Sequence, residues 1–319
     1  MAKDDLNSII DNDTAATWTP DLSEDDSHTA IDILVSEVAE ITSPKHPHEA
    51  ATNKTPTDHS STISEPDLTS HRWIQTALQE LACKIDFDPE HHKYVIKATS
   101  KSCISVSAFI DAFIPTFKDK EVAERVSDRD GVPTDEILED WRIRRDYSVV
   151  RGTEFHLYVK TFLTTGRKKP LQTPINNTVN GFHRFWNKNL HRYQCVATEF
   201  ILYDETLRLA GTIDSLFYHP KTNKYIIFDW KTNRHIRMKN NYHEKLLTPF
   251  DDLDACEYYK YSIQMTLYRD LLKRTLGLDV DKAFIIHFDH NYGHYKVIKT
   301  VDLAPRIDEA LTHLPKLYD

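Results

Sequence analysis

Hydrophobic and polar residues alternate along the middle of the chain in a pattern that predicts a β-hairpin. Residues 209–217 alternate weakly, and residues 225–230 form a short apolar run rich in residues that favour strands. Between the two runs, Pro220 and Asn223 belong to a segment with the composition of a tight turn. The two runs are therefore expected to pair as neighbouring strands.

Similar patterns extend through the rest of the chain and predict an α/β fold. The order helices, three strands, helix, strands is typical of a central mixed β-sheet flanked by helices, although other α/β folds could give the same periodicity. The expected helices are 73–83, 106–113, 120–128, 134–145, 153–163, 182–193, 256–276 and 305–317. The expected strands are a hairpin within 85–96, then 196–203, 209–217, 225–230, 283–289 and 295–301.

The composition changes sharply near residue 70. Residues 1–70 contain 15 Asp and Glu against 3 Lys and Arg, with many Ser, Thr and Pro, whereas the whole chain has 49 acidic and 40 basic residues. We therefore expect a disordered acidic N-terminal tail at 1–70, with a transient helix near 29–41, and one folded domain at 71–319. The domain keeps 37 basic and 34 acidic residues, a net charge of about +3 instead of the −9 of the whole chain, so the overall acidity does not argue against a nucleic-acid substrate.

Two carboxylates and a lysine at the predicted hairpin suggest metal-dependent phosphodiester chemistry. Asp229 and Lys231 are two apart on a strand, so they should share a face, with Trp230 in the opposite layer. A buried carboxylate is costly unless a metal or a substrate uses it, and Mg²⁺ needs few carboxylate ligands, so Asp214 and Asp229 would suffice. Taken alone, a D-x-K pair is more often a surface salt bridge.

Other polar residues extend this set. Gln264 and Tyr268 lie four apart on the 256–276 helix and so on one helical face, where hydrogen-bonded core positions are the alternative. His156 and Glu154 are about 200° apart around a helix, so both cannot face one metal. Glu199 is expected either near the site as a second acceptor or at a solvated sheet edge.

The order of these residues resembles the RecB-like branch of the PD-(D/E)XK nuclease superfamily, which includes mitochondrial genome maintenance exonucleases and phage and large-DNA-virus nucleases. The resemblance covers about residues 85–303, including Trp141 and Gly152-Thr153 before His156. The departures are Ile213-Asp214 in place of Pro-Asp and Asp229 in place of Glu. A PD-(D/E)XK nuclease-like core is thus expected at 71–319.

The resemblance also implies roles for single residues. His156, Asp214 and Asp229 would be metal ligands for Mg²⁺ or Mn²⁺, and Lys231 would be the catalytic lysine. Gln264 and Tyr268 would complete the catalytic set from the active-site helix.

Basic and aromatic residues cluster near these positions. A solvated surface is the default interpretation of such runs, but beside a nuclease site we expect phosphate contact and base stacking. A further segment, 232–255, is long enough to form a mobile flap. The expected nucleic-acid-binding residues are Arg167, Lys168, Lys169, Arg184, Trp186, Lys188, Arg192, Arg234 and Arg237.

The remaining features set the cellular context. None of the four cysteines forms a C-x2-C pair, so a zinc site is not expected. No apolar run has transmembrane length and no signal or transit segment is recognisable, so an intracellular protein without membrane association is expected, in an unknown compartment. A protein partner could bind the acidic tail.

The expected function is a Mg²⁺- or Mn²⁺-dependent deoxyribonuclease, an exonuclease that acts on DNA ends or single strands in replication, repair or recombination. The alternatives are a structure-selective or nicking endonuclease, a non-catalytic nucleic-acid-binding module on a nuclease fold, and a protein-interaction scaffold that works through its tail.

Overall fold

A computed structural model describes residues 71–314, except 90 and 92. The predicted acidic tail at 1–70 and its transient helix lie outside the described residues. The same holds for the last residues of the predicted helix 305–317. All element bounds below refer to the described part of the chain.

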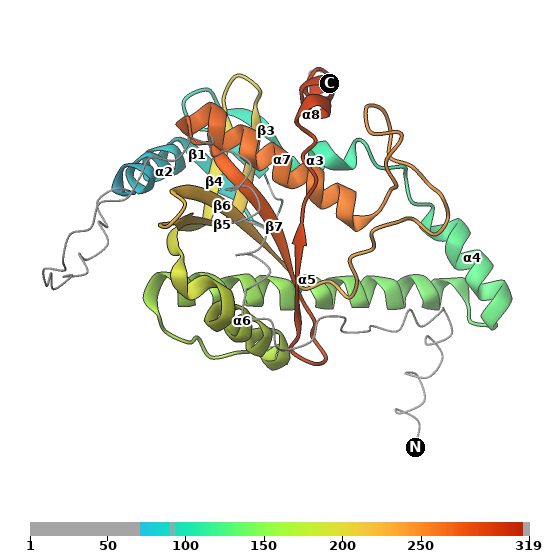
Figure 1. The fold of residues 1–319 in the computed structure, drawn as a ribbon. Coiled ribbons are helices and arrows are strands. Elements are labelled where there is room, and N and C mark those ends of the chain that lie inside the picture. The colour runs from blue at the N-terminus through green and yellow to red at the C-terminus, as the bar shows by residue number, and fades with distance from the viewer. Residues whose placement is uncertain (1–70, 90, 92, 315–319) are drawn as a thin grey trace, which may run out of the picture. The chain divides into compact units, whose positions relative to one another are not determined.

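A single mixed β-sheet of eight strands organises the described residues (Figure 1). The strand order is β1-β2-β3-β5-β6-β7-β8, and β4 pairs with β5 off this path. The pairs β3/β5 and β6/β7 are parallel and the other pairs are antiparallel, which confirms the predicted mixed sheet. The strands are β1 (Ile85–Asp88), β2 (Lys93–Ile96), β3 (Lys101–Ser105), β4 (Gln194–Asp204), β5 (Leu209–His219), β6 (Lys224–Lys231), β7 (Val280–Phe288) and β8 (Tyr295–Lys299).

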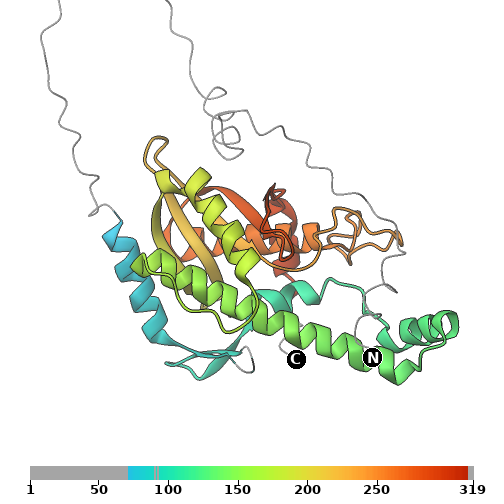
Figure 2. The same ribbon diagram turned by 90° about the horizontal axis from the view of Figure 1, so that it is seen from below.

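Helices cover both faces of this sheet, as Figures 1 and 2 show from two directions. Helix α7 packs on one face, and α6 with the C-terminal half of α5 packs on the other. The helices are α2 (Arg72–Lys84), α3 (Val106–Asp111), α4 (Asp119–Asp130), α5 (Thr134–Thr165), α6 (Asn176–Asn189), the 3-10 turn η1 (Leu190–Arg192), α7 (Glu257–Leu276) and α8 (Ala304–Leu311).

The two layers differ in their side chains because β6 alternates its residues between them. Ile227 joins the aliphatic cluster that includes Leu267 and Leu271 of α7. Trp230 is fully buried on the other side, with Phe182 and Phe185 of α6 at ring-centroid distances of 6.1 Å each. Burying one such large side chain contributes roughly 1.5–3 kcal/mol, so the alternation holds both layers against the strand that carries Asp229.

Helix α5 corrects one sequence-based expectation. The pattern predicts two helices, 134–145 and 153–163, but Thr134–Thr165 is one continuous helix of 32 residues. The link between the two predicted pieces, residues 142–150, is exposed throughout, so it contributes nothing to the core although it continues the helix. Gly152 lies inside the helix, and the helix ends at Gly166, which has a φ of 67°.

The segment between β6 and α7 is not the free flap that its length suggested. Leu246 and Phe250 are buried in the main core cluster, and the backbone N–H of Leu247 donates to the carbonyl of Phe113. Arg237 pairs with Glu257 at the start of α7, with 2.8 Å between Nη2 and Oε1. Strand β3 is also an addition, since the sequence pattern gave no strand there.

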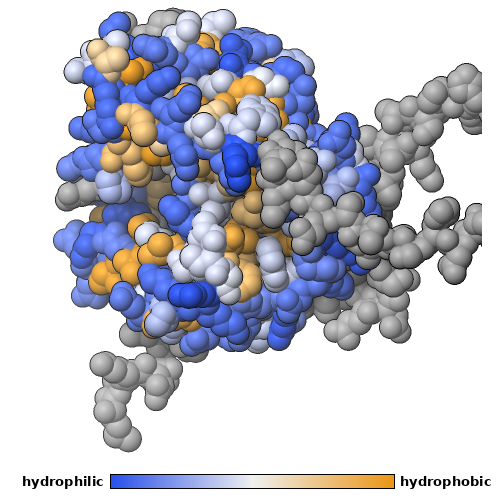
Figure 3. Space-filling model, turned by 90° about the vertical axis from the view of Figure 1, so that its left-hand side faces the viewer, coloured by the Kyte–Doolittle hydropathy of each residue, from blue (hydrophilic) through white to orange (hydrophobic). Residues whose placement is uncertain are grey.

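Surface character gives little further information about function. On the face drawn in Figure 3, hydrophobic residues form separate patches within a mainly hydrophilic surface. None of the helices described is both long enough and apolar enough to cross a lipid bilayer. The four cysteines are free thiols, and Cys83 is exposed, not buried.

Candidate active site

The paired strands β5 and β6 bring Asp214 next to Asp229. Their ladder ends at the pair Ser215 and Phe228, so Asp214 and Asp229 face each other one step beyond it. There the Asp214 side chain, not a backbone carbonyl, accepts the hydrogen bond from β6: its Oδ2 accepts the N–H of Trp230 at 2.7 Å. The carboxylate therefore satisfies a strand N–H that lacks a partner in β5, and it is held rigidly at the point where the strands part.

Lys231 lies on the same face of β6 as Asp229, as the two-residue spacing predicts. Its Nζ is 2.7 Å from Asp229 Oδ2, and it sits 4.6 Å from the ring centroid of Tyr261 on α7. The Asp229 side chain is only 3% exposed and that of Lys231 19%, so this is a largely buried ion pair and not the surface salt bridge of the alternative interpretation.

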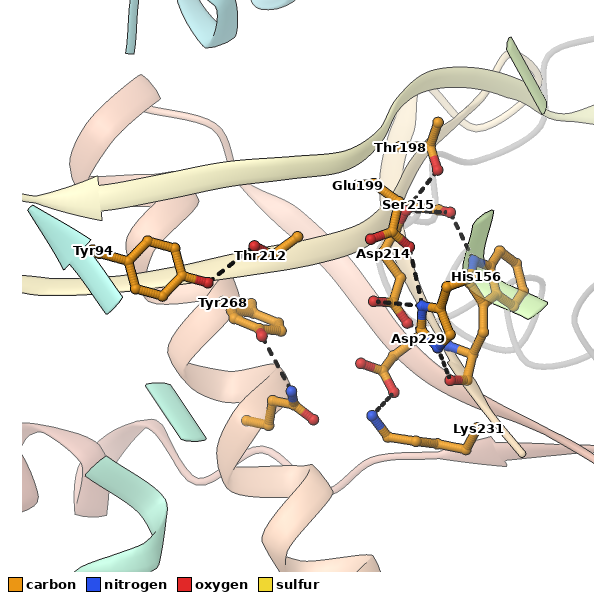
Figure 4. A network of polar contacts seen from close by, with 12 residues as sticks. Tyr94, His156, Thr198, Glu199, Thr212, Asp214, Ser215, Asp229, Lys231 and Tyr268 are labelled. Atoms are coloured by element: carbon orange, nitrogen blue, oxygen red, sulfur yellow. Dashed lines mark hydrogen bonds and ion pairs between the residues drawn. The ribbon is translucent and has the colours of Figure 1, made fainter. Parts of the chain in front are cut away.

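His156 reaches this site from α5 (Figure 4). Its Nδ1 is 3.0 Å from Glu199 Oε1 and 3.5 Å from Asp214 Oδ1, and its Nε2 is 3.0 Å from the carbonyl oxygen of Trp230. Since all three neighbours are acceptors, both ring nitrogens can donate only if the imidazole is protonated. His156 thus links α5 to β4, β5 and β6.

Glu199 belongs to this group. The flanking pairs Thr198/Ser215 and Phe200/Ile213 place it opposite Asp214, and its φ of 47° is unusual for a residue with a Cβ. Such backbone strain is common at functional sites. Ligand atoms of His156, Glu199 and Asp214 all lie within 4.8 Å of one another, so these three could hold one metal ion.

This group of three possible metal ligands differs in two residues from the set expected from the sequence, which was His156, Asp214 and Asp229. Asp229 is outside the three-residue group and pairs with Lys231 instead. Glu199, whose role the sequence left open, is inside it. The signal available in the sequence was a lone glutamate in an otherwise mainly apolar strand. Tyr261, which lies beneath the lysine, gave no signal.

Glu154 points away from the site, as the helical angle predicts. Its carboxylate accepts the backbone N–H groups of Gln172 and Thr173, the second at 2.7 Å, together with the Thr173 hydroxyl. These bonds lower the pKa of Glu154 although burial opposes them. Its role is to hold the segment between α5 and α6.

Burial raises the pKa of both strand carboxylates. For Asp229, burial and the neighbouring Asp214 raise the pKa to about 6, although Lys231 opposes the shift. For Asp214, burial raises the pKa, and His156 and Lys231 oppose it. Burial lowers the pKa of Lys231, but Asp229 and Asp214 more than offset this and keep the amine protonated. The site therefore concentrates negative charge that a cation would relieve.

The pKa of His156 is also displaced. Burial disfavours the charged imidazole, yet Asp214 and Glu199 raise the pKa to about 9. A proton therefore occupies the space between these acceptors at neutral pH, where a bound metal ion would replace it.

Gln264 and Tyr268 share one face of α7, as their spacing predicts. Gln264 Nε2 donates to Tyr268 Oη at 3.1 Å, and burial raises the pKa of Tyr268 well above its ordinary value. Gly211 on β5 makes room for this ring, because a Cβ there would lie 2.8 Å from Tyr268 Cε1. The pair therefore packs directly against the strand that carries Asp214.

Most of the predicted nucleic-acid-binding residues are not brought to the carboxylates. Arg184, Trp186 and Lys188 lie on α6, which covers the opposite face of the sheet, and Arg192 follows in η1. Trp186 is half-buried, with its ring 5.4 Å from that of Phe162. The basic run Arg167, Lys168 and Lys169 follows the far end of α5, which lies nine residues, or about 13 Å along the helix, beyond His156.

Two further predicted residues belong to the segment that follows Lys231 in the chain. Arg237 is neutralised by Glu257, whereas Arg234 is exposed and makes no ion pair with the carboxylates of the described residues.

Comparisons with known proteins gave a family match and weak likenesses to solved structures. A search among curated proteins found no match. Among solved structures, similar ones are a provisionally assigned exonuclease from Eubacterium rectale (13% identity, TM-score 0.35, 54% of this chain and 66% of that one) and the protein SSO0001 (12% identity, TM-score 0.30, 79% of this chain and 87% of that one). The chain thus spans just under two thirds of the first protein, and likenesses this weak carry no argument.

The family comparison is more informative. Residues 168–318 match the family model of the PD-(D/E)XK nuclease superfamily, a stretch that contains both strand carboxylates, Lys231 and the α7 pair but not His156. The match does not distinguish branches within the superfamily, so the RecB-like resemblance stays a prediction. Residues 168–318 of this chain are thus similar to the PD-(D/E)XK nuclease superfamily.

Proposed function

We propose that this protein is a divalent-metal-dependent deoxyribonuclease, and specifically an exonuclease that acts on DNA ends or single strands in replication, repair or recombination. The match of residues 168–318 to the family model of a nuclease superfamily supports a nucleic-acid substrate and phosphodiester hydrolysis. The choice of DNA, the preference for ends, the pathway and a protein partner for residues 1–70 are parts of the proposal.

One observation carries the proposal: a protonated lysine and a buried acidic group converge where β5 and β6 part. Lys231 Nζ is 2.7 Å from Asp229, and Asp214 lies between Asp229 on one side and His156 with Glu199 on the other. A structural salt bridge would not need two further acids and a histidine in the same buried space, because each added charge costs desolvation energy.

The residues present fit a divalent cation. His156, Glu199 and Asp214 offer one nitrogen and carboxylate oxygens within 4.8 Å of one another, a mixed set that suits Mn²⁺ and, with fewer direct contacts, Mg²⁺. Such a cation lowers the pKa of a bound water and polarises a phosphoryl oxygen. In this proposal Asp229 would be a further ligand from β6.

The chain's own residues would then orient the reactants. Because two carboxylates keep Lys231 protonated, its ammonium can donate hydrogen bonds but cannot accept a proton. Its role would be to orient the attacking water or to stabilise charge that builds on the phosphate. Tyr261 beneath the ammonium and Asp229 beside it would limit its motion.

The pair on α7 would complete the wall of the site. Tyr268 Oη accepts the Gln264 amide, which leaves the phenol hydrogen available to donate. We assign both residues to positioning of the water or the phosphate. Tyr268 is only 4% exposed, so its ring would keep bulk water away from that side.

A single assay tests the proposal. Labelled linear duplex, linear single-stranded and closed circular single-stranded DNA are incubated with Mg²⁺, Mn²⁺ or EDTA, and the products are separated by length. Metal-dependent digestion of linear strands with survival of the circle is the expected result. Cutting of the circle would instead support a structure-selective or nicking endonuclease.

The remaining alternatives give different products. Binding without any cleavage would support a non-catalytic nucleic-acid-binding module. Cleavage of an RNA strand of equal sequence in preference to DNA would overturn the choice of substrate.

A further inference from the structure

The middle of helix α5 is exposed on every side although it contains large apolar residues. Residues 142–150 are all exposed, and Ile143, Tyr147 and Val150 have 53%, 47% and 55% of their surface accessible. Their spacing of four and three places them on one face of the helix. Before this stretch Ile137 is buried, and after it Phe155 is buried, so both ends of the helix are anchored while the centre offers an open apolar and aromatic face.

Arg151 continues that face and forms no ion pair with an acidic residue of the described part of the chain. Its guanidinium carbon lies 5.5 Å from the ring centroid of Tyr147, and its Nε is buried without a hydrogen-bond partner among the described residues. Other arginines of α5 are neutralised: Arg142 bonds Glu139 at 2.6 Å and Asp146 at 3.0 Å. Arg151 is thus a cation that lies against the Tyr147 ring and has an Nε–H without an acceptor among the described residues.

The residue after this cation lies beside the end of the catalytic strand. A Cβ at Gly152 would be 3.6 Å from Oγ1 of Thr232, the residue that follows Lys231. His156 is five residues further along the same helix, a rise of about 7.5 Å.

Arg234 follows Thr232 by two residues, which is at most about 7 Å of chain. Since Gly152 approaches Thr232, Arg234 belongs to the same part of the protein as Arg151. Burial, Arg151 and Arg234 all lower the pKa of His290, which agrees with this placement. Asp289 opposes that shift, but its carboxylate is engaged by the N–H groups of Asn291 and Tyr292, at 2.6 and 2.9 Å. Two cations without ion-pair partners among the described carboxylates therefore lie on neighbouring segments, α5 and the chain that follows β6.

We propose that Tyr147, Arg151 and Arg234 form a subsite for the nucleotide next to the scissile phosphate of a single DNA strand. Arg151 and Arg234 bind its phosphate, and the half-exposed ring of Tyr147 stacks on its base. The assignment deepens the proposed nuclease function and rests on it. Charge complementarity selects a nucleic-acid strand as the occupant, because an aromatic surface with unpaired guanidiniums matches a base and its phosphate. A Tyr–Arg pair four residues apart that only stabilises the helix is the competing explanation.

The test uses the full-length protein and two substrates. Binding of a short fluorescein-labelled single strand is measured by fluorescence anisotropy in EDTA, which prevents cleavage. Hydrolysis is measured with metal on the same strand and on thymidine 5′-p-nitrophenyl phosphate, which has one phosphodiester and no neighbouring nucleotide. Thermal unfolding of each variant checks that it folds.

Arg151→Ala and Tyr147→Ala are each expected to weaken strand binding about tenfold at low salt, and Arg151→Ala also to reduce the salt dependence by about one phosphate contact. Tyr147→Phe keeps the ring and is expected to bind as the parent does. The matched control Arg142→Ala removes an arginine of the same helix that is already paired, and should change binding by less than about twofold. Turnover of the p-nitrophenyl ester should stay within about twofold of the parent, because that substrate does not reach the subsite.

The two proposals fail in different ways. If the parent hydrolyses both substrates but Arg151→Ala and Tyr147→Ala bind the strand as tightly as Arg142→Ala does, the subsite is wrong and the nuclease stands. If the parent hydrolyses neither substrate, the nuclease function is wrong, and equal binding by the three variants would also overturn the subsite. A loss of p-nitrophenyl ester turnover equal to the loss on the strand would show that Arg151 acts at the catalytic group itself, which also overturns the subsite.

Discussion

The Asp214 carboxylate holds the neighbouring strand at Trp230, with 2.7 Å between its Oδ2 and the Trp230 backbone nitrogen, while its Oδ1 lies 3.5 Å from His156 Nδ1. The same side chain thus completes a strand contact and contributes charge to the site. These two roles can be separated, because an amide retains the oxygen that accepts a hydrogen bond but loses the charge.

Asp214→Asn should therefore fold normally and lose activity. The asparagine oxygen can still accept the Trp230 N–H, and loss of a buried negative charge should leave the metal-free unfolding midpoint unchanged or higher. Turnover should fall by at least ~10², since a metal-binding charge is removed. Nuclease assays and thermal unfolding in EDTA check both parts, with Asp279→Asn as an exposed control. Metal-dependent cleavage that survives in Asp214→Asn would contradict the assignment.

Lys231→Ala should separate chemistry from binding. The carboxylates and His156 remain, so strand affinity should fall only modestly, while single-turnover cleavage should slow by ~10² or more through loss of one preorganised charge. Asp229, deprived of its partner, should also titrate at a higher pKa than its present value of about 6. Nearly unchanged cleavage would show that the lysine is only a salt-bridge partner.

The raised pKa of His156 predicts pH-dependent metal binding. Near neutral pH the imidazole carries a proton that a metal ion must displace, so Mn²⁺ affinity should rise up to about pH 9. Calorimetry in buffers of different ionisation enthalpy should detect the released proton in the parent but not in His156→Gln. Binding with no proton release at pH 7 would contradict this view of the site.

The same group links pH to stability in the absence of metal. The folded pKa of about 9 exceeds the unfolded value of about 6.5, so the stability that His156 contributes is fully present below pH 6.5 and is lost as pH rises through 9. The unfolding midpoint of the parent in EDTA should thus decline over this range more than that of His156→Gln. Parallel curves for the two proteins would exclude the linkage.

Gly211 gives a prediction about packing. A methyl group there would lie 2.8 Å from Tyr268 Cε1 and 3.0 Å from Val106, so Gly211→Ala must displace the ring. We expect a loss of about 1–3 kcal/mol in the free energy of unfolding, together with reduced cleavage. Gly152→Ala is the control, because its nearest contact would be an ordinary 3.6 Å and alanine favours a helix. Equal stability of both variants in denaturant titrations would refute the packing argument.

The acidic segment 1–70 can be tested by its removal. With 15 acidic and 3 basic residues it should compete with DNA phosphates, so truncation should leave cleavage at least as fast and tighten DNA binding at low salt. The difference should shrink as salt screens the charges. A truncated protein that is insoluble or inactive would show that these residues belong to the folded domain.

The sequence by itself determined most of the local structure and the identity of the strand residues. Apolar alternation located β5 and β6, and the two-residue spacing placed Asp229 with Lys231 and turned Trp230 to the other side, because a strand has a period of two whatever surrounds it. In the same way the spacing of Gln264 and Tyr268 set their common helical face. Such relations act within one element, so a short segment contains all the information.

Tertiary structure decided which residues from different elements meet. Glu199 joins His156 only because β4 pairs with β5 and α5 crosses beneath them, and no local pattern encodes that contact. Conversely, Trp186 and its basic neighbours look like a DNA-binding face, yet α6 uses its aromatic rings to cover the opposite side of the sheet. The centre of α5 is exposed and packs against no core, so its position rests on the anchoring of the two ends of the helix. These outcomes depend on contacts between residues far apart in the chain, which the periodicity of one segment cannot contain.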